Sequence, residues 1–158
     1  LGADGWQVIA EATYAVYGER GSIDLLAWHA ATGWLLVVEV KTALISLEAT
    51  LRKHDEKVRL APGIAAERFG WQVAGVARML VLPDSTSARR AVARQAAVLG
   101  GAYPLRADAL RQWLRSPTIE PRSASGLLFA PGTRGARGTG ARTTRKRIRR
   151  KRSSGDGS

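Results

Sequence analysis

The sequence contains no cysteine, and it has no hydrophobic run that approaches the length of a membrane span. The lack of cysteine excludes disulfides, cysteine-based zinc sites and cysteine nucleophiles. A spanning helix needs about 20 apolar residues, and no signal-peptide pattern opens the chain. The glycine motifs G-x-x-x-x-G-K-[ST] and G-x-G-x-x-G are missing as well, which excludes the phosphate-loop classes. We therefore expect a cytoplasmic protein that does not contact membranes.

Acidic residues are scarce, with 13 Asp and Glu against 25 Lys and Arg, and the net charge is +12. Most of this excess lies in residues 132–158, which hold ten Lys and Arg and one acid. This tail has no apolar core, so the composition predicts disorder. Such tails bind nucleic acid by neutralising phosphates, although an arginine-rich extension without a function is an equal alternative. The candidate binding residues of the tail are Arg145, Lys146, Arg147, Arg149 and Arg150.

Charged residues interrupt two hydrophobic segments between Gly21 and Thr42. Burying an unpaired charge costs several kcal/mol, so Asp24, Glu39 and Lys41 should be paired with each other or with a metal. Side chains alternate along a strand, which puts Glu39 and Lys41 on one face. A connection containing glycine predicts a hairpin, and residues opposite each other in a hairpin lie about 4.5–5.5 Å apart. Asp24 is therefore expected beside Glu39.

Two carboxylates this close require a cation between them. Mg²⁺ or Mn²⁺ would be held by Asp24 and Glu39, with the carbonyl of Val40 as a further oxygen ligand. Lys41 would orient or help to deprotonate a water, or would neutralise charge on a phosphate. The alternative is a structural pair of charges at a sheet edge. The apolar run from Trp34 to Val38 favours a central strand instead.

These residues resemble a known family. Gly21-Ser22-Ile23-Asp24, followed by a hydrophobic hairpin and Val38-Glu39-Val40-Lys41-Thr42, is similar to the motif of the PD-(D/E)XK nuclease superfamily, which has a restriction-endonuclease-like fold. The segment from Tyr17 to Asp24 looks more narrowly like nuclease-like domains of helix-turn-helix regulators in high-GC actinobacteria. The resemblance covers about half the chain, from Trp6 to Asp84. It implies a Mg²⁺-dependent endonuclease in which Asp24 and Glu39 bind metal and Lys41 is catalytic.

Other charged residues are candidates for supporting roles. Family members often carry another acid on a helix before the first strand, for which this sequence leaves no room ahead of Trp6. Glu11 inside a hydrophobic segment is the candidate third acid, and Glu19 is a second one. Arg20, Lys57 and Arg59 are candidate contacts for a nucleic-acid backbone.

Hydrophobic periodicity predicts a mixed α/β sheet that contains an antiparallel hairpin and is flanked by helices. The expected strands are residues 6–17, 23–29, 34–42 and 77–83. The expected helices are residues 46–60, 85–99 and 107–115. Pro62-Gly63 interrupts the helical pattern after the first, and Gly100-Gly101 ends the second. One domain is expected over 1–116, a linker over 117–131 and the tail over 132–158.

Three functions are consistent with these features. The first is a metal-dependent nuclease acting on nucleic acid, with DNA favoured. The second is a catalytically inactive nuclease-like module of a DNA-binding transcriptional regulator, which predicts a helix-turn-helix domain upstream. The third is non-specific nucleic-acid binding by the tail alone. Nucleases of this fold often act as dimers, so a homodimer is also considered.

Overall fold

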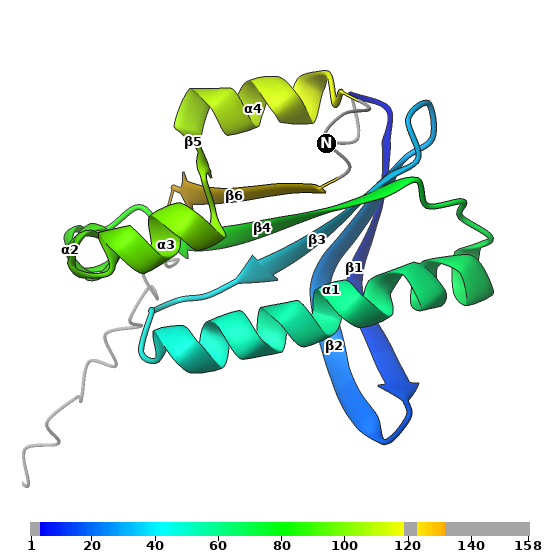
Figure 1. Cartoon of the computed structure of the whole chain (residues 1–158), viewed down its shortest axis with the longest axis horizontal. Coiled ribbons are helices and arrows are strands. Elements are labelled where there is room, and N and C mark those ends of the chain that lie inside the picture. Colours follow the sequence, from blue (N-terminus) through cyan, green and yellow to red (C-terminus); the bar gives the residue numbers. More distant parts are fainter. Residues whose placement is uncertain (1–3, 119–122, 132–158) are drawn as a thin grey trace, which may run out of the picture.

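The computed structural model describes residues 4–118 and 123–131, which form a mixed six-stranded sheet with helices on both faces (Figure 1). The strand order is β1-β2-β3-β4-β6-β5. The strands are β1 (Trp6–Val16), β2 (Glu19–His29), β3 (Trp34–Val40), β4 (Gly75–Pro83), β5 (Leu105–Arg106) and β6 (Ser123–Ala130). The helices are α1 (Leu47–Phe69), α2 (Thr86–Arg94), α3 (Ala96–Ala102) and α4 (Ala107–Arg115). The predicted α/β class and the mixed sheet with an antiparallel hairpin are confirmed.

Strands β1 and β2 form a long antiparallel hairpin that runs past the rest of the sheet beneath α1 (Figure 1). Its turn consists of Tyr17 and Gly18, whose φ angles of 50° and 81° are both positive. Two successive positive φ values fit the right-handed twist of a hairpin. Strand β2 therefore begins at Glu19, earlier than the sequence predicts. Gly21 is required on β2 because a Cβ there would lie 2.6 Å from the hydroxyl of Tyr14.

Strand β3 lies in the interior of the sheet, antiparallel to β2 and parallel to β4. Six of its seven residues are buried, and only Val40 is exposed, at 46%. The prediction of a central strand is therefore confirmed, and the alternative of a pair at a sheet edge is wrong. A parallel neighbour requires a long connection, and α1 provides it between β3 and β4.

Helix α1 continues through Pro62, where the sequence predicts an interruption. Ser46 begins the helix by accepting a hydrogen bond from the N–H of Ala49, and Gly70 ends it with a φ of 66°. A proline inside a helix costs about 3 kcal/mol because it removes a hydrogen bond. The burial of Ala61 and Ile64 beside the proline, against the sheet, offsets this cost.

The predicted helix over 85–99 is two helices, α2 and α3, which meet at Gln95. Ser85 caps α2 by accepting a hydrogen bond from the N–H of Ala88. The glycines at 100 and 101 lie within α3 and do not end it. Helix α3 continues past them because Leu99 and Tyr103, four residues apart, are both fully buried against the sheet. The prediction of α4 at Ala107–Arg115 is confirmed.

The predicted linker over 117–131 is wrong for its second half, which forms β6 and pairs parallel with β4. The small and polar residues of this segment suggest a loop when they are read alone. Gly126 has a structural reason, since a Cβ there would lie 2.6 Å from the side chain of Leu110 in α4. Leu127 is buried at the other face, so the sheet extends beyond residue 116. The tail and its candidate binding residues lie outside the described residues.

Candidate functional site

Asp24 lies where strand β2 separates from β3. The β2–β3 ladder stops at the pair Leu25 and Val38, and beyond it Oδ2 of Asp24 accepts the backbone N–H of Val40 at 2.6 Å. The carboxylate thus takes the place of a strand partner for a group that would otherwise be unpaired. This bond holds Asp24 next to Glu39, which precedes Val40 on β3. The structure brings the two carboxylates together as the sequence predicts.

Lys41 follows β3 and contacts the same carboxylate. Its backbone N–H donates to the carbonyl of Val81 at 2.9 Å, which extends the pairing of β3 with β4 by one residue. Its Nζ lies 2.7 Å from Oε1 of Glu39. The two side chains therefore share a face, as strand alternation predicts. Glu39 is 1% exposed, whereas the Lys41 side chain remains 35% exposed and accessible to solvent.

Lys57 of α1 is a member of the site that the sequence assigns to a different role. Its Nζ forms an ion pair with Oε2 of Glu39 and lies 3.5 Å from Oδ1 of Asp24. The residue is 5% exposed, so it is not available to a nucleic-acid backbone on the surface. A signal was present, because Thr50, His54 and Lys57 follow the helical spacing of the buried apolar stripe. Polar residues on a buried stripe indicate partners on the facing sheet.

The two lysines control the charge of Glu39. Burial alone would raise the pKa of this carboxyl, but hydrogen bonds from Lys41 and Lys57 and their positive charges outweigh burial. The net effect lowers the pKa, so Glu39 is ionised at neutral pH. A buried anion in contact with two cations is a stable arrangement without any further ligand.

Glu11, the expected third acid, does not join the site. On β1, Ala10 pairs with Leu25 and Ala12 pairs with Ile23. Asp24 is therefore the residue opposite Glu11, but Glu11 and Asp24 are not paired in the ladder. Its φ of 50° marks a kink, and the side chain is exposed. Because of the kink, Ile9 and Ala12 pack on the same side of the sheet although they are three positions apart. Glu11 turns outward. Among residues 4–118 and 123–131 no three His, Cys, Asp or Glu are grouped to hold a metal.

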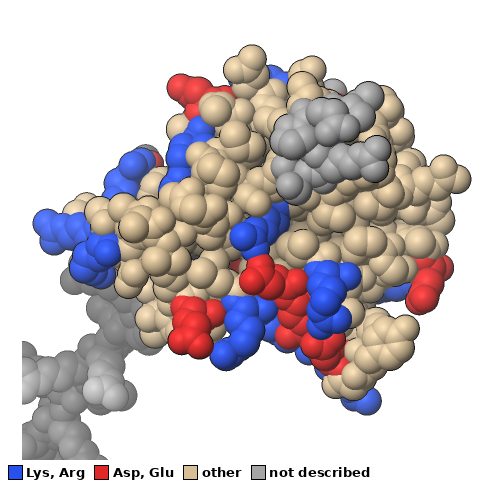
Figure 2. All heavy atoms as spheres, in the orientation of Figure 1, with Lys and Arg blue, Asp and Glu red and all other residues tan. Residues whose placement is uncertain are grey.

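The surface around α1 is not a basic patch. Figure 2 shows acidic and basic side chains intermixed over this helix. Arg59 donates to both carboxylate oxygens of Glu19, at 2.8 and 2.7 Å, so neither is free for its predicted role. Lys53 is similarly bound to Glu56 at 2.6 Å. Arg20 is exposed on the β1–β2 hairpin and remains accessible to a phosphate.

A buried hydrogen-bonded chain lies behind the site. His54 of α1 is fully buried, with Nε2 3.1 Å from the carbonyl of Val37 and Nδ1 2.8 Å from the hydroxyl of Tyr103. The carbonyl can only accept, so Nε2 carries the proton and Nδ1 accepts from Tyr103. Burial lowers the pKa of His54 to about 4 and raises that of Tyr103 to about 12. Both groups are neutral at pH 7, and they join α1 to β3 and to the end of α3.

Arg78 of β4 closes this chain at the surface. Its guanidinium lies 5.1 Å from the centre of the Tyr103 ring, pairs with Asp55, and donates to the carbonyl of Ala102 at 3.2 Å. These contacts fix α1 and α3 relative to the sheet on the side from which Lys57 reaches the two carboxylates.

Comparisons with protein-family models, with curated proteins and with solved structures find no match for this chain. Within the described part of the chain, none of the helices has the length and apolar character needed to span a bilayer. The function must therefore be argued from the site itself.

Proposed function

We propose that this chain is a nuclease-like domain that hydrolyses phosphodiester bonds of nucleic acid, with DNA as the first candidate, and that it requires a divalent metal. One observation carries the proposal. Asp24 and Glu39 lie together at the end of β3, and Lys41 contacts the carboxylate of Glu39. Carboxylates beside a solvent-accessible lysine are suited to phosphate chemistry. The antiparallel β1-β2-β3 unit, with α1 leading to parallel β4, also supports a restriction-endonuclease-like core.

The donor atoms of the site fit Mg²⁺ or Mn²⁺ in kind. Asp24 and Glu39 offer hard carboxylate oxygens, and half-exposed Val40 offers a backbone carbonyl between Glu39 and Lys41. These three residues would hold the ion, with water and phosphate oxygens as its other ligands. When bound, the metal would lower the pKa of its water and neutralise charge on the phosphate.

The two lysines have different tasks in this proposal. Lys57 is buried and fixes the Glu39 carboxylate from the α1 side, so it acts as a positioning residue. Lys41 is partly exposed, and its ammonium can turn from Glu39 toward a phosphate oxygen or toward an attacking water. It would stabilise the negative charge that develops on the phosphate in the transition state. Lys41 is therefore the catalytic lysine of the proposal.

The sharpest test replaces Lys41, because its exposure makes damage to the fold small. Purified chain is incubated with Mg²⁺ or Mn²⁺ and with linear, supercoiled and branched DNA, and separately with RNA. We expect cleavage by the unaltered chain, a loss of about 10²-fold or more in Lys41→Gln, and no change in Lys53→Gln, which removes the same charge from the α1 surface. Asp24→Ala and Glu39→Ala should also abolish cleavage. The proposal fails if the unaltered chain cuts none of these substrates, or if Lys41→Gln cuts as well as Lys53→Gln.

A second function is favoured by the position of Lys57. Its ammonium lies within 3.5 Å of Asp24 and contacts Glu39 as well, so it already provides a positive charge to both carboxylates. This arrangement is consistent with a catalytically inactive nuclease-like module that serves a DNA-binding transcriptional regulator. Its stability would not depend on a metal.

Metal binding distinguishes the two functions. Isothermal titration with Mn²⁺ is compared for the unaltered chain, for Glu39→Gln and for the surface control Glu48→Gln. A nuclease requires saturable binding that Glu39→Gln abolishes and Glu48→Gln retains. An inactive module predicts equal, weak heats in all three proteins, together with DNA binding that is unchanged by Glu39→Gln.

A further inference from the structure

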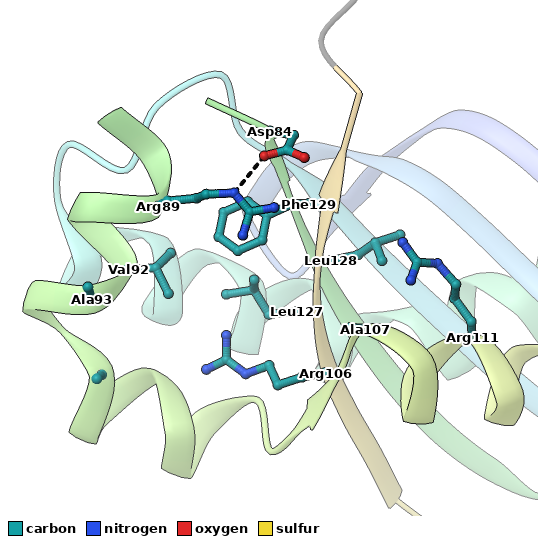
Figure 3. Close-up of a pocket in the computed structure, with 11 residues that line it drawn as sticks. Asp84, Arg89, Val92, Ala93, Arg106, Ala107, Arg111, Leu127, Leu128 and Phe129 are labelled. Carbon is teal, nitrogen blue, oxygen red and sulfur yellow. Dashed lines mark hydrogen bonds and ion pairs between the residues drawn. The ribbon is translucent and has the colours of Figure 1, made fainter. Parts of the chain in front are cut away.

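A pocket of about 540 Å³ lies beside β6, toward the β5 edge of the sheet, and shares no residue with the Asp24 site. Three arginines line it from different elements: Arg89 from α2, Arg106 from the end of β5 and Arg111 from α4 (Figure 3). Val92 and Leu127 lie between Arg89 and Arg106 in Figure 3 and give the pocket an apolar wall. The volume is that of a typical small-molecule site.

The pocket has positive charge that the described residues do not fully neutralise. Asp84 is its one acidic residue, and it pairs with Arg89 at 2.7 Å. Arg89 also lies over the ring of Phe129, 4.5 Å from its centre, so this guanidinium is held in place. Two further guanidinium charges remain.

Arg106 is the most informative of the three arginines. It is half-buried, yet its side chain forms no hydrogen bond or ion pair with another described residue. Within the described part of the chain, Arg111 pairs with Asp108 at 3.1 Å, and that carboxylate is fully exposed and screened by water. A half-buried guanidinium without a partner has lost part of its hydration with no compensating contact, which is the state that an anionic ligand would relieve.

We infer that this pocket binds a nucleoside phosphate monoester. Arginine matches the geometry of a phosphate with two parallel N–H donors, and a phosphate monoester carries a charge of about −1.5 to −2 at pH 7. Arg106 supplies a positive charge that no described acidic side chain neutralises. The phosphate contacts Arg106, and the planar base lies on the apolar wall of Val92 and Leu127, which are on the same side of β6 (Figure 3).

Two kinds of molecule carry a nucleoside phosphate monoester: a free mononucleotide and a nucleic-acid strand with a terminal phosphate. The inference goes beyond the proposed nuclease function and does not depend on it, because no residue of the pocket takes part in the Asp24 site. Binding should therefore persist without divalent metal and in the Glu39→Gln protein. This independence separates a failure of one proposal from a failure of the other.

The test is calorimetric titration of the full chain with AMP and CMP, in metal-free buffer that contains EDTA. The matched pair is Arg106→Gln and Arg94→Gln, since Arg94 is exposed on α2 and does not line the pocket. Both variants lose one positive charge, and both keep residues 132–158, so any contribution of that basic segment is the same. Loss of a charged hydrogen bond should weaken AMP binding about tenfold or more in Arg106→Gln, and Arg94→Gln should bind as the unaltered chain does.

The organic and ionic parts of the ligand are tested separately. Adenosine and inorganic phosphate should each bind at least about tenfold more weakly than AMP. Competition by a 5′-phosphorylated oligonucleotide, but not by its 5′-hydroxyl form, would identify a strand terminus as the source. Failure of the phosphorylated strand to compete would identify a free nucleotide. The inference is overturned if neither mononucleotide binds, if adenosine or phosphate binds as tightly as AMP, or if Arg106→Gln and Arg94→Gln bind AMP equally.

Discussion

Two charged regions of this molecule are built in opposite ways. At the end of β3 the carboxylates of Asp24 and Glu39 are in contact with Lys57, and Glu39 also contacts Lys41. In the pocket beside β6, Arg89 pairs with Asp84, Arg111 pairs with the fully exposed Asp108, and the side chain of Arg106 has no partner among the described residues. The first region is stable in itself, while the second lacks an anion. In the proposals above, a phosphate replaces an existing contact of Lys41 in the first region, whereas in the second it meets a guanidinium without a described partner.

Among the variants that test this contrast, Glu39→Gln should have the largest effect on the free energy of unfolding. Glu39→Gln leaves the buried ammonium of Lys57 with only Asp24, at 3.5 Å, as an anionic partner. Removing one member of a buried ion pair costs about 3–5 kcal/mol of unfolding free energy. Urea denaturation at pH 7 measures this loss, with Glu48→Gln as the control because its side chain is 90% exposed. The double variant Glu39→Gln with Lys57→Met should recover part of the stability. Equal losses in Glu39→Gln and Glu48→Gln would show that the Lys57 contact is not a buried pair.

Acid should destabilise the protein through His54 before it reaches the carboxylates. The pKa of His54 is about 4 in the folded chain and 6.5 when unfolded, so the unfolded state binds more protons between these values. Stability is complete above pH 6.5 and falls by about 3 kcal/mol as the pH drops to 4. The pKa of Glu39 is also lowered on folding, which adds a further loss below its unfolded value of 4.5.

Urea denaturation at a series of pH values checks this dependence. His54→Gln should remove the slope between pH 6.5 and 4, whereas His29→Gln should retain it because His29 is partly exposed on the far end of β2. A slope that persists in His54→Gln would assign the acid sensitivity to another group.

Asp24 should matter less to stability than Glu39, although both belong to one site. Its side chain is 33% exposed, and its main contact is the N–H of Val40. Asp24→Ala removes that acceptor and should cost about 1–2 kcal/mol. Asp24→Asn keeps an oxygen for the Val40 N–H and should cost less. Thermal denaturation ranks the two variants with Glu39→Gln, and a larger loss in Asp24→Asn than in Asp24→Ala would contradict the role given to this bond.

Strand alternation and the apolar run were enough to predict that Glu39 and Lys41 share a face of a central strand. Asp24 was placed beside them by the hairpin. Local patterns failed where a distant segment decides the structure. Leu110 packs over Gly126 in the segment that looks like a linker in the sequence but forms β6. Pro62 stays helical because its neighbours are buried.

The composition of the site also depended on long-range contacts. The role of Lys57 could not be read from its neighbours, because Glu39 lies 18 residues earlier in the chain. The kink at Glu11 could not be predicted either, because no residue pattern in this apolar segment indicates a positive φ. The arginines of the β6 pocket come from three elements, and only the folded sheet brings them together.

The smallest expected effect on stability comes from Arg106, and it is the sharpest test of the contrast between the two regions. Arg106 has no described partner to lose, so Arg106→Gln should change the unfolding free energy by no more than about 0.5 kcal/mol. Arg78→Gln is the matched comparison, because Arg78 pairs with Asp55 and donates to Ala102. Its loss should cost about 1–3 kcal/mol, since it removes the contacts with Asp55, with the carbonyl of Ala102 and with the Tyr103 ring. Urea denaturation of both variants decides the matter: a loss in Arg106→Gln as large as that in Arg78→Gln would mean that Arg106 stabilises the fold, and the pocket would then have no spare cation for a phosphate.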